Sequence, residues 1–523
     1  MTLFEPFARR PAITALLLGV GAAQGFAPLE AWWLALPCLA CWLALVHAAP
    51  GVRAALWRGW LFGLAHLSVA NSWIQRAFTY QDAMPAWLGY FAPVLLSVYL
   101  AIFPMMAAGL AWRWGRAHRA GAKPDLSFVL MAGAGWVLTE WLRGWALTGY
   151  PWAPLGLIWV PLLGVAQSAA WIGTYALSGL TLVVAGALLL LAQRQWRLAA
   201  VMAPVLGVLS LNGIEIPTTP PVLDQAVLPR VRAVQPNLDE EARPTPDYPE
   251  RNLRAALAQS GAPGPAPRLV MWPEGALRYL IEEGYPRDYY WRGDPATIRR
   301  RMTAGLGPRD LLLTGGSAAS FRPDGEIETV TNSIFVLNAR GEILGRYDKA
   351  HLVPWGEYLP WRALLAPIGF ARLVPGSIDF APGQGPRTLP LPGFGGAGML
   401  ICYEVIFSGE IVDPRHRPAF IFNPSNDAWY GRSGPAQHLA MARLRAIEEG
   451  LPIIRATPTG ISAIIDAHGR VLASVAPGAT GAAETELPPP APPTLFARLG
   501  SLMTLLVGAL LAVAAVAFRR FGR

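Results

Sequence analysis

The sequence predicts a multi-pass α-helical membrane domain joined to an α/β domain. The 523-residue chain is 53% hydrophobic and only 15% charged, whereas about a quarter of the residues of a soluble protein are charged. Long apolar runs fill the chain up to residue 215, while residues 220–490 hold short apolar runs punctuated by Pro and Gly. We therefore expect a seven-span membrane domain over 1–215, an α/β domain over 220–490 and an eighth membrane helix over 497–518.

Each of the eight apolar runs is long enough to cross ~30 Å of hydrocarbon. Loops on one side of the predicted spans, together with the chain ends, hold thirteen Lys and Arg residues, whereas loops on the other side hold only Arg76 and Arg143. Because positively charged loops remain in the cytoplasm, we expect both termini to be cytoplasmic and the α/β domain to lie on the opposite side. The predicted spans cover residues 11–28, 31–48, 55–75, 86–112, 127–146, 163–192, 196–213 and 497–518.

One charged pair, Glu140 and Arg143, lies near the outer end of the fifth predicted span. Charged residues at that depth are costly and often functional. Two opposite charges three residues apart on a helix can also neutralise each other. We favour the second interpretation, in which the pair has no role beyond its own neutralisation.

The strands expected in residues 220–490 are short apolar runs bounded by turn residues. Two hairpins, 335–344 and 463–472, each place a Gly in a polar turn between alternating strands. A segment of about 270 residues is large enough to bury its own core, and a Pro-rich linker over 487–493 leads back to the membrane. Other strands are expected at 231–235, 268–272, 311–314, 398–401 and 419–422, and helices at 248–259 and 436–449.

Cys402 directly follows the apolar run that ends at Ile401. A thiol at the end of a strand is held on rigid backbone, with free amides nearby to receive a developing oxyanion. Since a free cysteine is more often a small buried hydrophobe, this position alone does not decide its role. Cys38 and Cys41 lie in an apolar run without acidic or His neighbours, so we expect them to be packing residues without a disulfide or metal.

Two further charged residues follow predicted strands, Glu274 in a Pro/Gly-flanked turn and Lys349 after a hairpin. Singly, each is an ordinary solvated charge. Together with the Cys402 thiol they supply the chemistry of acyl transfer. A carboxylate can accept the thiol proton, and an ammonium can stabilise the oxyanion and lower the pKa of the thiol.

Three motifs carry a resemblance to the nitrilase superfamily and its Glu-Lys-Cys catalytic residues. They are Trp272-Pro-Glu-Gly275, the stretch from Tyr347 to Tyr358 and Ile401-Cys-Tyr-Glu404. The order of seven spans, this domain and one closing span resembles the apolipoprotein N-acyltransferase family. The resemblance implies an αββα sandwich in the periplasm of a bacterium, anchored in the inner membrane. It also implies a phospholipid acyl donor and an acceptor apolipoprotein, whose N-terminal diacylglyceryl-cysteine becomes N-acylated.

The same resemblance implies a ping-pong mechanism. Cys402 would attack the sn-1 ester of a phospholipid, expected to be phosphatidylethanolamine, and the acceptor amine would attack the resulting thioester. Glu274 would act as the general base, and Lys349 with the amide of Tyr403 would stabilise the oxyanions. Glu357 is expected to orient Lys349, with Tyr403 and Glu404 as supporting residues. The sequence departs from the family's pattern at one place. The family often carries a Trp shortly after the Val-Gln of its first strand, whereas residues 237–244, which follow Val234-Gln235, contain none.

An apolar stretch over residues 355–374, which we call the arm, follows Lys349. A surface loop is rarely so apolar, so we expect the arm to lie on the membrane over the site and to admit lipid. Its apolar side chains are Trp355, Trp361, Leu364, Leu365, Ile368, Phe370 and Leu373.

Two other functions remain open at this stage. A membrane-tethered nitrilase or amidase would use the same three residues on a small amide, and a transporter or scaffold would need only the eight spans. We expect no cofactor, metal or nucleic acid, and we expect the protein to act as a monomer.

Overall fold

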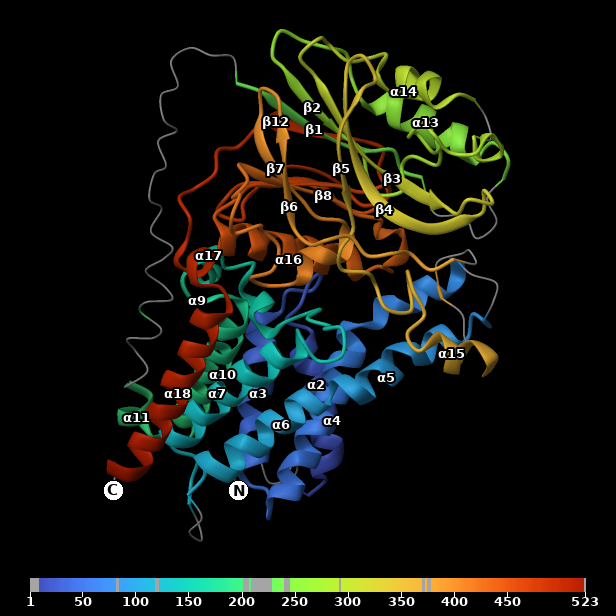
Figure 1. The fold of residues 1–523 in the computed structure, drawn as a ribbon. Helices are drawn as coiled ribbons and strands as arrows, with labels where there is room; N and C mark the ends of the chain where they lie inside the picture. Colours follow the sequence, from blue (N-terminus) through green and yellow to red (C-terminus); the bar gives the residue numbers. More distant parts are fainter. Residues whose placement is uncertain are drawn as a thin grey trace.

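The protein has two stacked parts, a bundle of helices and a pair of β-sheets (Figure 1). Figure 1 shows both chain termini at the end of the bundle remote from the sheets. The computed structural model describes residues 9–80, 84–117, 122–200, 207, 228–238, 245–290, 293–368, 372–373 and 378–521.

The helical bundle is built mainly from the N-terminal part of the chain, joined by the last helix. Its long elements are α2 (Pro11–Ala23), α3 (Trp32–His47), α4 (Val52–Ala70), α5 (Leu88–Leu100), α6 (Ile102–Leu110), α7 (Leu126–Arg143), α10 (Thr174–Ala192) and α18 (Ser501–Phe521). Shorter elements connect them: η1 (Ser72–Tyr80), η2 (Ala111–Gly115), η3 (Leu155–Trp159), α8 (Leu163–Ala166), α9 (Ala169–Ile172), α11 (Trp196–Ala200) and α17 (Leu495–Leu499).

Within the described residues, three helices are long and apolar enough to cross a membrane: Leu88–Gly115, Thr174–Ala192 and Ser501–Arg520. The expected single span over 163–192 is wrong, because Gly173 adopts a left-handed φ of 77° that separates α9 from α10. Of the expected span 196–213, the structure describes α11 and residue 207, and the rest lies outside the described residues. The number of spans therefore stays a prediction.

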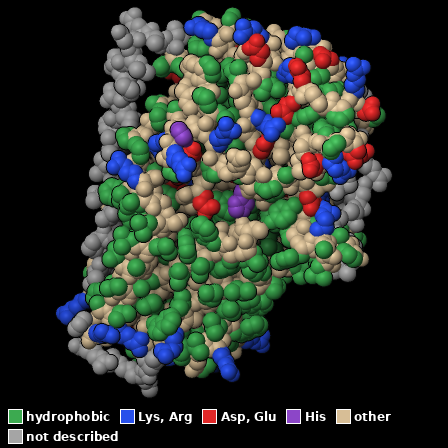
Figure 2. Space-filling view, viewed as in Figure 1, with side chains coloured by type: hydrophobic (Ala, Val, Ile, Leu, Met, Phe, Trp, Pro, Cys, Tyr) green, Lys and Arg blue, Asp and Glu red, His purple; other side chains and the backbone are tan. Residues whose placement is uncertain are grey.

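The outer surface of the bundle is apolar, as Figure 2 shows for the face in view. On α18, Leu502 and Leu510 are 64% and 59% exposed, and on α5, Tyr90 and Leu95 are 67% and 65% exposed. Contiguous apolar surface of this kind indicates contact with lipid, which agrees with a membrane domain.

The second part is a sandwich of two six-stranded sheets, in the orders β12-β1-β2-β3-β4-β5 and β11-β10-β9-β8-β7-β6. The first sheet contains β1 (Arg230–Gln235), β2 (Arg268–Met271), β3 (Leu311–Phe321), β4 (Ile327–Asn338), β5 (Ile343–Asp348) and β12 (Gly481–Glu486). The second contains β6 (Arg387–Leu391), β7 (Gly395–Met399), β8 (Phe420–Pro424), β9 (Ile453–Ala456), β10 (Ser462–Ile465) and β11 (Val471–Val475).

Alternation along the strands assigns their faces. On β2, Leu269 and Met271 join the core between the sheets, whereas Val270, together with Trp272 just after the strand, packs beneath α13 (Tyr248–Gln259) and α14 (Pro295–Thr303). On the far side, α16 (Gly434–Glu449) lies between the second sheet and the helical bundle (Figure 1). The expected αββα order is therefore present. The expected strands and hairpins form, while β6, β9, β12 and α14 were not predicted.

A buried polar cluster joins the sandwich to the bundle. The carboxylate of Glu448 on α16 accepts hydrogen bonds from the amide and hydroxyl of Thr174, both at 2.6 Å, at the first residue of α10. Arg445 lies 2.8 Å from the other oxygen of Glu448. Because an acidic group satisfies the free amides at a helix N-terminus, this contact fixes α10 beneath the sandwich.

Candidate active site

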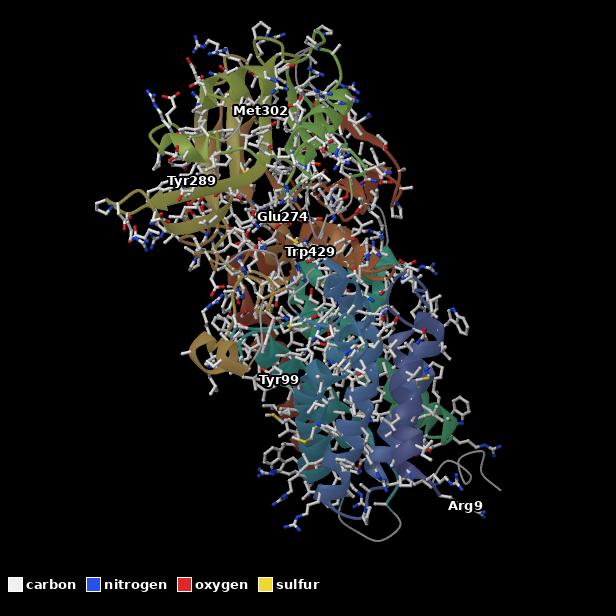
Figure 3. All side chains as sticks on the ribbon, turned by 90° about the vertical axis from the view of Figure 1, so that its right-hand side faces the viewer. Arg9, Tyr99, Glu274, Tyr289, Met302 and Trp429 are labelled. Carbon is white, nitrogen blue, oxygen red and sulfur yellow. The ribbon has the colours of Figure 1, made fainter. Side chains whose placement is uncertain are left out.

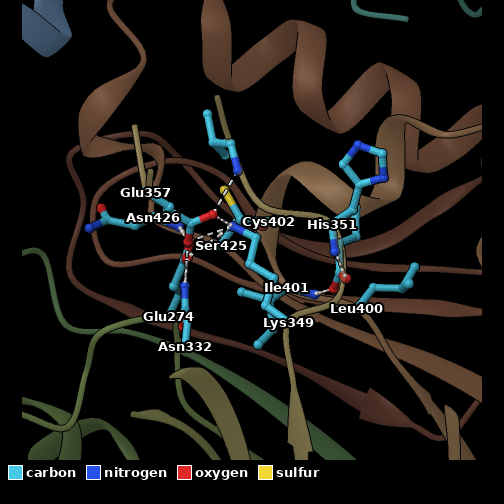
Figure 4. Close-up of polar contacts among 12 residues, drawn as sticks. Glu274, Asn332, Lys349, His351, Glu357, Leu400, Ile401, Cys402, Ser425 and Asn426 are labelled. Atoms are coloured by element: carbon cyan, nitrogen blue, oxygen red, sulfur yellow. Dashed lines mark hydrogen bonds and ion pairs between the residues drawn. The ribbon is translucent and has the colours of Figure 1, made fainter. Parts of the chain in front are cut away.

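Glu274, Lys349 and Cys402 lie together although 128 residues separate the first from the last. Each follows the end of a strand, β2, β5 and β7 respectively, so the rigid sheets set the positions of all three (Figure 4). Figure 3 shows Glu274 close to the junction between the sheets and the helical bundle. The three residues expected from the sequence are therefore brought together at the membrane-facing side of the sandwich.

Cys402 occupies a sharp turn between β7 and the short helix η6 (Cys402–Ile406). Its φ of 52° is left-handed, a strained conformation for a residue with a side chain. The side chain is buried, and its Sγ lies 3.1 Å from the hydroxyl of Tyr430. The thiol is also close enough to Glu274 for the negative charge of that carboxylate to raise the pKa of the thiol.

The carboxylate of Glu274 is fixed from two sides. The side-chain amide of Asn332 on β4 donates to one oxygen at 2.7 Å, and the main-chain amide of Asn426 donates to the other at 2.7 Å. Burial raises the pKa of Glu274, and the ammonium of Lys349 opposes that rise. The carboxylate therefore has a higher proton affinity than an exposed glutamate, which suits a general base.

The ammonium of Lys349 is 1% exposed and lies between two carboxylates. It is 2.9 Å from an oxygen of Glu357 and 3.8 Å from an oxygen of Glu274. Burial alone lowers the pKa of Lys349, but Glu357 and Glu274 outweigh it, and the pKa is raised. Lys349 is consequently a permanent cation beside the thiol, and Glu357 is the carboxylate that orients it.

The pKa of the Cys402 thiol differs from the expectation. Lys349 lowers this pKa, as the sequence predicted. Burial and the negative charge of Glu274 raise it by more than Lys349 lowers it, so the pKa of the thiol lies above its ordinary value. The correction follows from the low-dielectric surroundings, which penalise a thiolate more than one ammonium favours it. The resting thiol is therefore protonated, and Glu274 is the candidate base for its proton.

Glu404 and Tyr403 support the turn in different ways. One oxygen of Glu404 accepts from the main-chain amides of Ala350 and His351 at 2.8 and 3.0 Å, and the other accepts from the amide of Ile401 at 2.6 Å. Glu404 therefore ties the loop that follows Lys349 to the turn that carries the thiol. The main-chain amide of Tyr403 donates to no acceptor among the described residues, and it is free to bind an oxyanion.

The sequence alone assigned no role to Asn332, to Tyr430 or to the groups that hold the carbonyl of Cys402. The Asn332 amide bridges Glu274 and Glu357, donating to the latter at 2.9 Å. His438 lies with its Nε2 3.2 Å from the Cys402 carbonyl oxygen, and burial lowers its pKa to about 4, so the ring is neutral. Their roles could not be read from the local sequence, since they arise only where distant segments of the fold meet.

The helical bundle supplies one wall of the site. The rings of Trp73 and Trp152 lie 4.6 and 5.2 Å from the ring of Tyr430, whose hydroxyl touches the thiol. The hydroxyl of Tyr403 also donates to the carbonyl of Gly149 at 3.1 Å. Loops between the membrane helices therefore pack directly behind the reacting atom. We call Trp73 and Trp152 the aromatic wall.

The Glu140–Arg143 pair holds this wall in place. The pair forms, at 3.5 Å, but both residues are buried and make further contacts. Arg143 donates to the carbonyl of Trp152 at 2.7 Å, and Glu140 accepts from the amide of Leu155 at 3.0 Å. The interpretation of a pair that only neutralises itself is therefore wrong, because both charges organise the loop that carries Trp152.

The arm leaves the sandwich on the side of the helical bundle, and it contains α15 (Arg362–Leu365), labelled in Figure 1, and η5 (Ala366–Ile368). Trp361 and Leu364 are 65% and 70% exposed, while Trp355 is 37% exposed. Leu365 and Leu373 are half-buried. Phe370 and the side chain of Ile368 lie outside the described residues. Residues 239–244, part of the segment in which the family's Trp is missing, also lie outside them.

Comparisons with known proteins agree along nearly the whole chain. Residues 18–187 match the apolipoprotein N-acyltransferase N-terminal domain, and residues 230–490 match the carbon-nitrogen hydrolase domain. An apolipoprotein N-acyltransferase of Rhodopseudomonas palustris is 35% identical over 94% of this chain and 92% of its own. That of Bradyrhizobium diazoefficiens is 34% identical over 97% of this chain and 94% of its own.

The chain belongs to the apolipoprotein N-acyltransferase family. The match to the N-terminal domain model favours this family over a tethered amidase, and the carbon-nitrogen hydrolase match confirms the expected nitrilase-like fold. Among solved structures, Saccharomyces cerevisiae Nit3, a member of the nitrilase superfamily, is 20% identical and covers 50% of this chain and 92% of its own, with a TM-score of 0.34.

Two neighbouring glycines on β3 test how tightly Glu274 must be placed. A Cβ added to Gly315 would lie 2.7 Å from the Cα of Glu274 and 2.7 Å from the carbonyl of Pro273, whereas one added to Gly316 would come no closer than 3.3 Å to any neighbour. Since a displacement of about 1 Å can cost ~100-fold in rate, Gly315→Ala should lower kcat/KM for acyl transfer by about that factor. Gly316→Ala should stay within about threefold of wild type. Equal losses in the two variants would contradict the dependence on Glu274.

Proposed function

We propose that the protein transfers an acyl chain from a phospholipid to the N-terminal amine of an apolipoprotein, through a thioester on Cys402. The observation that carries this proposal is a buried cluster in which the Lys349 ammonium lies 3.8 Å from the Glu274 carboxylate and both charges act on the Cys402 thiol. That cluster occurs in a chain that belongs to the acyltransferase family over nearly its full length. The roles of the three residues follow from their contacts.

In the first half-reaction, Glu274 accepts the thiol proton as Sγ attacks the ester carbonyl carbon. The Lys349 ammonium and the free amide of Tyr403 stabilise the oxyanion that forms. The C–O bond of the ester then breaks, and the departing alkoxide takes the proton from Glu274. The products are a thioester on Cys402 and a lysophospholipid.

In the second half-reaction, the neutral amine of the N-terminal diacylglyceryl-cysteine attacks the thioester carbon. Glu274 accepts a proton from that amine, and the same two donors stabilise the second oxyanion. The C–S bond breaks, the amide is released and the thiolate recovers its proton from Glu274. The atoms and charges balance without a cofactor.

The thioester must survive until the acceptor arrives, so water has to be kept away from it. Cys402 is 4% exposed and the aromatic wall lies behind Tyr430, which supports transfer to an amine over hydrolysis. A tethered amidase would have no need of a wall built by the membrane domain. Release of ammonia from small amides by the purified protein without lipid would favour the amidase.

The setting of the reaction is part of the same proposal. The asymmetry of Lys and Arg between loops supports cytoplasmic termini and a periplasmic catalytic domain at a bacterial inner membrane. The sn-1 ester of phosphatidylethanolamine is the proposed acyl source, and the protein is proposed to act as a monomer. The exposed arm supports entry of the donor along the membrane surface.

Removing the nucleophile tests the proposal directly. Cys402→Ala should abolish transfer of a labelled acyl chain from phospholipid to a diacylglyceryl lipopeptide, because no thioester can form. Cys38→Ala and Cys41→Ala should keep wild-type activity, since both thiols lie in α3. Comparable losses in the three variants, measured in the same mixed micelles, would remove Cys402 from the nucleophile's role.

The pH dependence of the reaction should report the raised pKa of Glu274. The base acts only when ionised, so kcat/KM should fall as the pH drops through that pKa. Because the pKa is raised, the acid limb should lie above the ordinary glutamate value of 4.5. A limb at or below 4.5 in the wild type would show that another group sets it. Glu274→Gln should lose activity at every pH.

Charge on the arm should impair use of bilayer lipid without affecting the thiol. Leu364→Glu replaces an exposed leucine, whose burial in lipid is worth ~1.5–3 kcal/mol, with a carboxylate. Thioester formation from vesicles should fall at least ~tenfold, while alkylation of Cys402 by a small soluble reagent should be unchanged. The control is Leu344→Glu on β5, another exposed leucine. Equal effects of the two substitutions would exclude the arm as the entry route.

A further inference from the structure

A groove lies between three helical elements of the bundle and extends to the end of α18 remote from the sandwich. Its volume is about 810 Å³, and its walls come from α6 with η2, from α7 and from α18. That volume is within the ~300–1,000 Å³ typical of ligand sites. The groove is separate from the active site, because it runs along α7 from Met131 to Leu138, whereas the other end of α7 leads to the aromatic wall.

Small residues open the groove and hydrogen bonds fix its walls. Ala134, Gly135, Gly508 and Ala509 line it, so no long side chain fills the space at those positions. The hydroxyl of Ser127 on α7 donates to the carbonyl of Ala515 on α18 at 2.8 Å. The groove is therefore a fixed feature of the packing of α7 against α18.

Two guanidinium groups line one end of this otherwise apolar groove. Arg519 donates to the carbonyl of Trp114 at 2.6 Å, which ties α18 to η2. Neither Arg519 nor Arg520 forms an ion pair with a carboxylate among the described residues. Figure 2 shows Lys and Arg side chains gathered at this end of the molecule. An apolar channel that ends at two cations, neither paired with a carboxylate in the part of the chain that the structure describes, matches a molecule with long alkyl chains and an anionic head.

We propose that this groove binds an anionic phospholipid, with its acyl chains along α7 and α18 and its phosphate at Arg519 and Arg520. Arginine favours this role because its fork of N–H donors matches phosphate oxygens, and basic pockets between membrane helices bind anionic head groups. Only 11% of the apolar window of α18 is buried by protein, so the lipid also packs against a helix that has few protein neighbours. The bound lipid is not the acyl donor, because its head group lies at Arg519 and Arg520, at the end of α18 remote from the sandwich that carries Cys402.

Native mass spectrometry of the full-length protein tests this site with dioleoylphosphatidylglycerol and dioleoylphosphatidylcholine at equal concentrations. The wild type should retain the anionic lipid at least about tenfold more than the zwitterionic one. Arg520→Gln, and more strongly Arg519→Gln with Arg520→Gln, should reduce that preference. Arg520 is exposed and has no ion pair among the described residues, so its replacement should leave the fold intact.

Two controls separate a built site from general attraction to positive charge. Arg10→Gln with Arg53→Gln removes two exposed charges near the starts of α2 and α4 and should leave the preference unchanged. Ala509→Leu keeps both arginines but fills the groove, and it should release the lipid. Equal retention of the two lipids by the wild type would overturn the proposal. So would an equal loss in the Arg10/Arg53 control, or full retention in Ala509→Leu. Acyl transfer by the same variants, measured in parallel, reports on the active site independently of lipid retention in the groove.

Discussion

The site depends on the burial of one ammonium between two carboxylates. Lys349 is almost fully buried, and a charge in such a place is tolerated only when it is paired. Glu357 forms the closer ion pair with Lys349, at 2.9 Å, and Glu274 forms a longer one at 3.8 Å. Removal of one member of a buried pair typically costs ~3–5 kcal/mol because the other is left uncompensated. The arrangement of the three charges is therefore a condition for the fold of this region as well as for its chemistry.

The same balance explains why the thiol rests in its protonated form. A neutral Cys402 leaves Lys349 matched to its carboxylates, whereas a thiolate would place a further negative charge in a low-dielectric site. In the proposed reaction, the proton moves to Glu274 only as the bond to the acyl carbon forms. This order would limit the time for which a reactive thiolate exists, and it would suit a thioester that has to wait for a second substrate.

The membrane helices do more than anchor the sandwich. Trp73 and Trp152 pack on the tyrosine that contacts the thiol, and Arg143 holds the loop that carries Trp152. Glu448 fixes the start of α10 from the opposite side of the same interface. The active site is consequently completed where the two parts meet, and separation of the sandwich from the bundle would expose Tyr430 and the thiol to water.

The sequence was sufficient to predict the elements and residues whose signals are local. Glu274, Lys349 and Cys402 each follow a short apolar strand, and a strand end fixes the direction of the next side chain. Asn332 and Tyr430 carried no such signal, because their roles arise from contacts between distant segments. The sequence predicts a lowered pKa for the Cys402 thiol, whereas the structure raises it, because the burial of a side chain cannot be read from its neighbours in the sequence. The break at Gly173 was missed because the apolar run continues through it.

The most direct test of the account is the mass of the protein after incubation with a phospholipid that has different chains at sn-1 and sn-2. The account predicts an adduct with the mass of the sn-1 acyl chain, located on the peptide containing Cys402, labile to hydroxylamine and discharged by a diacylglyceryl lipopeptide. An adduct on another residue, or steady formation of N-acylated lipopeptide without any acyl-enzyme, would contradict it.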